Sequence, residues 1–446
     1  MRRTLLVVGL LPGLVAINIF AQQVQAASGD HAGAGQAGAP VTITVPDALQ
    51  RARANAPQFL AAVTEAAVVH QERVQARAAM LPSLSYTTSY LYTQGNGTPT
   101  GVFIANNAVH EYLAQGNAHE ALNLGFGQVA EYRRAAAAEA LAQAKAEIAA
   151  RGLVVTVVQN YYGYVIAQRK HSNAQQAASE AERFLKTSQE LERGGEVARS
   201  DVIKAQLQFN DRQRELQESQ LAADKARLGL AVLLFPKFTQ DFSVVDDLRF
   251  SPPLPAMAEV MKMAEDKNPD LRAASGALRV AEHEVQVAWS AHFPTVTFDY
   301  WYGIDAIHFA TYTGRIRNLG YAAEATLNLP IWNWGATQSK VKQASLRREQ
   351  ARVELTFAQR QLLANLNAFY AEASTARAEL DALRSSAELA AESLRLTNLR
   401  YQAGEATALE IVDAQNTLVQ ARNAYDDGEG RYRLALAILQ TLTGPF

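Results

Sequence analysis

Four segments of the first half of the chain recur in the second half, in the same order and at separations of 205 to 212 residues. The matched pairs are 48–59 with 257–271, 81–85 with 293–297, 122–126 with 327–332, and 195–206 with 404–415. A recurrence of this kind predicts one architecture present twice, rather than a row of unrelated domains. We therefore expect a first structural repeat over 45–234, a turn-rich linker over 235–255 and a second repeat over 256–446. Each repeat should contain two short helices, a pair of strands, a very long helix and a medium helix.

The long helices are the clearest local feature. No Gly or Pro occurs between positions 336 and 403, which permits about 100 Å of continuous helix at 1.5 Å per residue. Small and apolar side chains recur along this stretch with a period close to 3.5, which is typical of a coiled coil. The corresponding helix of the first half, about 128–193, is interrupted only by Gly152 and Gly163. Glycine-containing turns follow both, so each is expected to fold back as a helical hairpin, ending near 234 and 441.

The segments 83–93 and 295–305 alternate with period two and predict β-strands, with return strands over about 110–126 and 318–332. A half-buried sheet in a soluble domain is one interpretation of these strands.

The N-terminus favours a different interpretation of the strands, because it predicts an exported chain. Arg2 and Arg3, an apolar run and a small-residue site predict a signal peptide over 1–26. The alternative, a membrane anchor, is disfavoured by the short run and by Pro12. Residues 27–44 are expected to be a flexible segment. For an exported chain, tyrosine-rich alternating strands favour an outer-membrane barrel.

Four strands cannot close a barrel, since the smallest closed barrels need about eight. Open edges are not tolerated in lipid, so several chains must share one barrel. Two chains would supply eight strands and a filled interior, whereas three would supply twelve and leave room for water.

Composition excludes several functions. Lys plus Arg is 42 and Asp plus Glu is 44, so no basic excess is present for binding nucleic acid. Cysteine is absent, which removes disulfides, thiolate metal sites and a lipid-modified cysteine. The eight histidines form no compact ligand spacing, and His283 and His292 lie nine residues apart. Asp246 and Asp247 in the linker are interpreted as solvated charges. We therefore expect no enzyme activity, no cofactor and no metal site.

The segments 327–344 and 401–418, together with the duplication, resemble the outer membrane efflux proteins typified by TolC. The resemblance covers nearly all of the predicted mature chain. It implies an α+β membrane protein in which each chain gives four transmembrane strands to a trimeric 12-stranded barrel. Antiparallel coiled-coil hairpins would form a tunnel in the periplasm. The implied partners are two further copies, outer-membrane lipid, a periplasmic adaptor protein and an inner-membrane transporter. The implied function is an exit channel for a tripartite efflux pump or for type I protein secretion.

The resemblance also assigns roles to residues near the turns of the hairpins. Glu410 and Asp413, three apart on one helix face, match an acidic ring at the tunnel entrance. Solubility alone is the other explanation for these two acids. Ser200, Asp201 and Tyr401 match positions that hydrogen-bond between neighbouring hairpins and hold the entrance shut, although Tyr401 also fits as the end of the coiled-coil seam.

The two turns are the implied docking surface for the adaptor. Their residues are Gly194, Gly195, Glu196, Val197, Gly404, Glu405 and Ala406. Some family members carry an arginine latch at the position of Ala406. Two other classes of protein remain open from the residues alone: a structural periplasmic coiled-coil adaptor, which should carry one hairpin beside a lipoyl-like domain, and an exported enzyme. The transported substrate is not encoded in any feature of this sequence.

Overall fold

The structure is a computed structural model that describes residues 41–95, 97, 109–237, 240–250 and 252–444. The predicted signal peptide and most of the predicted flexible segment lie outside these residues. The end of that flexible segment was predicted wrongly. Residues Val41–Ile43 form strand β1, and Thr44 caps the next helix through a reciprocal capping box with Asp47.

Both halves of the chain contain two short helices, two long strands, a very long helix and a medium helix. The elements of the first half are α1 (Val45–Asn55), α2 (Pro57–Ala78), β2 (Ser83–Tyr92), β3 (His110–Asn123), α3 (Gly127–Gly194) and α4 (Arg199–Leu234). Those of the second half are α5 (Met257–Lys267), α6 (Pro269–Ser290), β5 (Thr295–Ala306), β8 (Leu319–Asn328), α7 (Ala336–Gln402) and α8 (Ala408–Thr443). Three short elements complete the described chain: β4 (Phe242–Val244), which pairs with β1, and the hairpin β6 (Tyr312–Thr313) and β7 (Ile316–Arg317).

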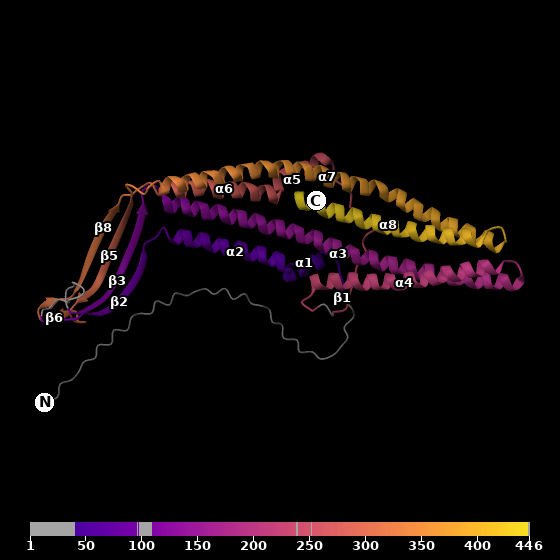
Figure 1. Cartoon of the computed structure of the whole chain (residues 1–446), viewed down its shortest axis with the longest axis horizontal. Coiled ribbons are helices and arrows are strands. Elements are labelled where there is room, and N and C mark those ends of the chain that lie inside the picture. Colours follow the sequence, from indigo (N-terminus) through magenta and orange to yellow (C-terminus); the bar gives the residue numbers. More distant parts are fainter. Residues whose placement is uncertain (1–40, 96, 98–108, 238–239, 251, 445–446) are drawn as a thin grey trace, which may run out of the picture. The chain divides into compact units, whose positions relative to one another are not determined.

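The four long strands form one antiparallel sheet in the order β2-β3-β5-β8 (Figure 1). The register places Ser83, His119, Asp299 and Glu324 in one row on a mostly polar face. The opposite face is mostly apolar, yet its large side chains are exposed: Leu84, Tyr86, Phe298, Tyr300, Tyr302 and Tyr321. Strands β2 and β8 are the two edges, and each has a partner on one side only. The sheet therefore has two open edges and an uncovered apolar face.

The helices pack lengthwise. We call α3 with α4 the first hairpin and α7 with α8 the second hairpin; α3 also contacts α2, α6 and α8, and α6 contacts α7. Leucine and alanine make up most of the buried seam of α7, as at Leu362, Leu366, Ala373 and Ala376. No helix among the described residues combines the length and the apolar character needed to cross a membrane.

The linker is bound to the hairpins by four tyrosines, and we call residues 242–250 and 252–255 the strap. The Tyr161 hydroxyl lies 2.8 Å from the carbonyl oxygen of Val245, and the Tyr162 hydroxyl lies 3.0 Å from Asp247. Tyr432 and Tyr370 donate in the same way to the carbonyls of Pro252 and Pro255. Burial raises the pKa of Tyr161 to about 12, so its hydroxyl stays a donor at all physiological pH values.

Asp246 and Asp247 are partly exposed, with 41% and 39% of their side chains accessible, but they are not only solvated charges, because both also make specific bonds. The guanidinium of Arg169 in α3 donates to both oxygens of Asp246, at 2.6 and 2.7 Å. Asp247 accepts from Tyr162 and lies 3.7 Å from Arg433, which is on α8. The strap therefore joins the first hairpin to the second, and both aspartates are part of that connection.

Arg169 also reaches across to α8, where it donates to Asp426 at 3.1 Å and to Glu429 at 2.5 Å. One guanidinium thus holds three carboxylates at the level of the strap. Burial would raise the pKa of Asp246, but the bonds from Arg169 outweigh it and the pKa lies below its ordinary value. Asp426 is buried more deeply, and its burial raises its pKa above the ordinary value.

Candidate functional site

The two hairpins end in the same backbone motif. Gly195 and Gly404 adopt left-handed conformations, with φ of 78° and 74°, which a side chain would strain. In the first turn the amide of Glu196 donates to the carbonyl of Leu191, and in the second the amide of Glu405 donates to that of Arg400. These bonds define a Schellman motif at each turn. Glycine is thus required at one position of each predicted docking turn.

The other residues of the predicted docking turns are mostly exposed. Gly194 is the last residue of α3, and Glu196 and Glu405 face solvent. Val197 and Ala406 are instead partly buried against an apolar cluster that includes Phe184, and so they support the turns from within. The surface that a partner could contact is therefore polar, and it lies over a small apolar core shared by the two hairpins.

The second turn is fixed more firmly than the first. Thr407 caps α8, and the carboxylate of Glu410 returns to the backbone amide of Thr407 at 3.0 Å. Arg400 donates to Glu410 at 3.2 Å and to the carbonyl of Glu405 at 3.0 Å. The first turn lacks a side-chain cap, because its N-cap residue is Ala198. Arg400, which sequence reasoning did not single out, supplies a cation at this turn from the helix before the glycine.

The two acids predicted for an entrance ring have different surroundings. The hydrogen bonds from Thr407, with Arg400 nearby, hold the pKa of Glu410 below its ordinary value, so it is ionised at neutral pH. Its charge is partly offset by Arg400. Asp413 is exposed and has no hydrogen bond or ion pair with any described residue. Within one chain, Asp413 is therefore the less compensated negative charge of the two.

The three residues predicted for a latch are not brought together in one chain. Tyr401 is buried, and its hydroxyl lies 3.0 Å from the hydroxyl of Ser188 in the first hairpin. Asp201 accepts from Lys204 on its own helix at 3.2 Å, and Ser200 is exposed. Tyr401 and Asp201 do not contact each other within one chain, and a latch between hairpins of neighbouring chains stays a prediction. Tyr401 points into the core shared by the hairpins, where its ring meets Phe184 edge-on, whereas Asp201 lies at the start of α4.

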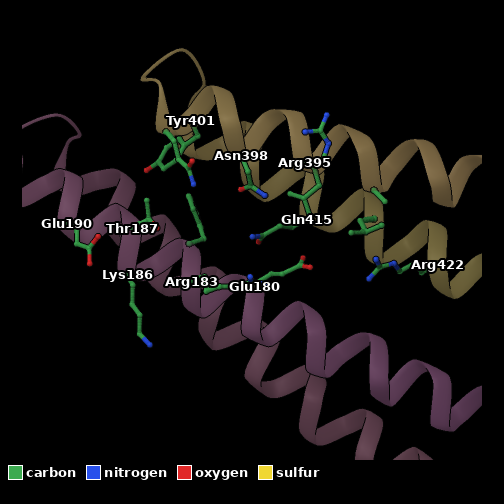
Figure 2. A pocket seen from close by; sticks show the side chains of 15 residues that line it. Glu180, Arg183, Lys186, Thr187, Glu190, Arg395, Asn398, Tyr401, Gln415 and Arg422 are labelled. Carbon is green, nitrogen blue, oxygen red and sulfur yellow. The ribbon is translucent and has the colours of Figure 1, made fainter.

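A groove lies between the two hairpins beside Tyr401 (Figure 2). Its volume is about 500 Å³, and α3 lines one side while α7 and α8 line the other. Four of its side chains are cationic and two are anionic: Arg183, Lys186, Arg395 and Arg422, with Glu180 and Glu190. Gln415 lies in the groove wall and is only 4% exposed, and its Oε1 has no hydrogen-bond partner among the described residues. The groove therefore offers positive charge to a partner.

The described residues include no group of three or more His, Asp or Glu side chains placed to hold a metal ion. The geometry of this site is that of a binding surface at the end of two hairpins.

Comparison with known proteins agrees with this geometry. The family model described as outer membrane efflux protein matches residues 48–234 and 260–445. The chain belongs to this family. It is 25% identical over 414 residues to the alkaline protease secretion protein AprF of Pseudomonas aeruginosa, with 89% of this chain and 84% of AprF covered. It is 23% identical over 401 residues to the outer membrane protein TolC of Vibrio cholerae, with 87% of each chain covered.

Solved structures show the same fold. The open state of the MtrE outer membrane channel of Neisseria gonorrhoeae superposes with a TM-score of 0.74, at 21% identity, covering 90% of this chain and 88% of MtrE. VceC of Vibrio cholerae superposes with a TM-score of 0.75, at 16% identity, covering 90% and 96% of the two chains. The protein is an outer-membrane transport protein of the TolC family that extends into the periplasm.

Proposed function

We propose that three copies of this chain form the outer-membrane exit channel of a tripartite efflux pump. The observation that carries this proposal is the four-stranded sheet with two open edges and an exposed apolar face, continued by two long hairpins. Three such sheets supply twelve strands, which close a barrel wide enough for a water-filled lumen. The apolar face would meet lipid and the polar face would line the lumen. Conduction is passive, and an inner-membrane transporter supplies the energy.

The groove and the turns beside it support contact with a periplasmic adaptor. The groove lies between the hairpins, carries more cations than anions and contains an unsatisfied acceptor at Gln415. A helical partner with carboxylates would complement its charge. Docking there would compete with the contacts that hold the two hairpins together, and so could shift the entrance towards an open state.

Glu410 and Asp413 are proposed to line the entrance, where three copies would give up to six negative charges. Such a ring attracts cations over about 8 Å at physiological salt. The double variant Glu410→Gln with Asp413→Asn should lower the cation preference of single channels in planar bilayers. Asp211→Asn, an exposed acid on α4, is the matched control. Unchanged ion selectivity in the double variant would contradict the ring.

A second function, the exit channel of a type I protein secretion system, is favoured by the matches to AprF and to the proteases secretion protein PrtF of Dickeya chrysanthemi, which is 21% identical over 407 residues. The chain is also 26% identical over 332 residues to the outer membrane protein OprJ of Pseudomonas aeruginosa. The inner-membrane transporter that co-purifies after cross-linking in cells would distinguish efflux from secretion.

Assembly is tested by cysteine cross-linking, which is unambiguous because the chain has no native cysteine. Thr87→Cys on edge strand β2 would be combined in turn with a cysteine at Gly320, Ala322 or Glu324 on edge strand β8. Oxidation in isolated outer membranes should join neighbouring chains and stop at three. The single variant Thr87→Cys is the control. Species larger than three chains, or monomers alone from all three combinations, would overturn the proposal.

A further inference from the structure

A small hollow lies at the junction between the sheet and the helices. It has a volume of about 270 Å³ and is formed by the start of α3 and the end of α6. Its lining residues are Gly125, Phe126, Val129, Ala130, Arg133, Val285, Gln286 and Trp289. The apolar part of the lining comes from both helices, and Arg133 is the one charged side chain in it.

Two aromatic side chains at this hollow are exposed without an evident covering. Phe126 is 72% exposed and Trp289 is 53% exposed. The backbone of Phe126 is in the left-handed region, with φ of 58°, which is strained for a bulky residue. A conformation of this kind persists only where the surrounding structure imposes it. The chain therefore holds a large apolar ring at the surface at a cost in backbone energy.

The strand order does not place a neighbouring copy at this hollow. α3 follows β3 and α6 precedes β5, and these are the two inner strands of the sheet. Another chain would add its strands at β2 or β8, beyond the inner pair. The water-filled lumen is an unfavourable place for exposed Phe and Trp rings. The boundary of a bilayer, in contrast, is where Trp side chains are enriched in membrane proteins.

The polar groups in the hollow are donors. Arg133 makes no hydrogen bond or ion pair with any described residue, whereas its neighbour Arg134 is held by Glu131 at 2.5 Å. The Oε1 of Gln286, which also lines the hollow, lies 3.1 Å from a ring nitrogen of His283, and its amide NH₂ has no acceptor among the described residues. A guanidinium beside an amide donor is suited to phosphate oxygens. Apolar rings next to these donors suit the start of an acyl chain.

We propose that this hollow binds the headgroup phosphate of a phospholipid in the periplasmic leaflet of the outer membrane. Arg133 and Gln286 would contact the phosphate, and Phe126 and Trp289 would contact the glycerol and the upper acyl chains. The inference rests on the proposed function, because it needs the sheet to span the membrane with its apolar face in lipid. It adds a lipid site on each chain, just below the sheet.

The test counts lipids bound to the purified full-length protein by native mass spectrometry during titration with dioleoyl-phosphatidylglycerol. The wild type should retain one lipid per chain. Arg133→Gln and Trp289→Ala should each lower the affinity for the lipid about tenfold. Arg133→Lys should keep most of that affinity. Arg134→Gln is the matched control, because it removes the same charge one residue away, outside the hollow. It should retain the lipid as the wild type does.

Three results would overturn the lipid site: wild-type retention in Arg133→Gln, an equal loss in Arg134→Gln, or displacement of the lipid by millimolar inorganic phosphate. The last result would mean that the hollow binds a free anion. Conductance in planar bilayers separates this inference from the proposed function. Variants that conduct as trimers but show no change in lipid retention refute the lipid site alone, whereas a wild type that never conducts refutes the channel.

Discussion

At the scale of single residues, the least expected feature is Arg169, which holds Asp246, Asp426 and Glu429 together. The side chain of Arg169 is only 16% exposed, and Glu429 is buried almost completely. Removing one partner from a buried ionic cluster leaves the other charges buried without a counter-charge. The stability lost in this way exceeds the stability that the intact cluster contributes. Arg169 is therefore a position where a single substitution should have a large effect on stability.

Arg169→Gln is expected to destabilise the protein by about 3–5 kcal/mol at pH 7. When the pKa of a carboxyl is raised in the folded state, the folded protein becomes more stable as the pH falls through that pKa, and burial already raises the pKa of Asp426. The loss of folding stability caused by Arg169→Gln should therefore be smaller at pH 5 than at pH 7. Thermal unfolding of the purified protein at both pH values measures this. Lys170→Gln, which breaks a more exposed pair with Asp427, is the control and should change little. An equal loss at both pH values would contradict the prediction.

The sequence alone could not show this cluster. The partners of Arg169 lie 77, 257 and 260 residues away along the chain, and no local pattern relates them. The same holds for Tyr401, whose partner Ser188 is 213 residues away. The proposed roles of Glu410 and Asp413, by contrast, rest on a sequence motif. The structure adds that Glu410 also caps its own helix, which the spacing of Thr407 and Glu410 could have indicated.

At the scale of elements, the long helices follow from local sequence, because an uninterrupted run without Gly or Pro and a regular seam are both local properties. Gly152 and Gly163 do not interrupt α3, which is continuous over 68 residues. A helical glycine costs only about 1 kcal/mol relative to alanine, and packing against the neighbouring helices exceeds that cost. Gly430 on α8 has different surroundings, because a methyl group there would overlap the Cδ1 of Ile166 on α3 and that side chain would have to shift.

Two glycine substitutions should change the folding stability in opposite directions. Gly430→Ala should destabilise the protein by about 1–3 kcal/mol, because the added methyl group meets Ile166. Combining it with Ile166→Val, which shortens that side chain, should restore part of the loss. Gly152→Ala should stabilise by about 0.5–1 kcal/mol, because nothing described lies within 4 Å of the new methyl group. Thermal unfolding midpoints measure all three. A destabilising Gly152→Ala would mean that another molecule packs against this face.

At the scale of the whole molecule, Tyr401 and Ser188 form a buried contact between the two hairpins close to their ends. If the hairpins separate when the channel opens, this hydrogen bond breaks. Tyr401→Phe keeps the ring against Phe184 but removes the bond, which is worth about 1 kcal/mol in each chain. The variant should therefore be open more often, because the closed state loses this contact and the open state does not.

Single-channel recordings in planar bilayers measure this effect. Tyr401→Phe and Ser188→Ala should each raise the average conductance, and the double variant should add little to either, because both remove the same bond. Thr397→Ala, whose hydroxyl bonds only within its own helix, is the control. A double variant with the summed effect of the two single ones would show that the two hydroxyls act separately.

The strap lies well away from the ends of the hairpins, and that distance sets how motion is transmitted. Arg169, bonded to the strap, is 24 residues from Arg193 along α3, or about 36 Å of helix. A stiff rod pivoting at a fixed point moves furthest at its free end. If a partner pushes at the turns, as the proposed docking requires, it would act with a long lever arm, and a small rotation at Arg169 would give a larger displacement at the hairpin ends.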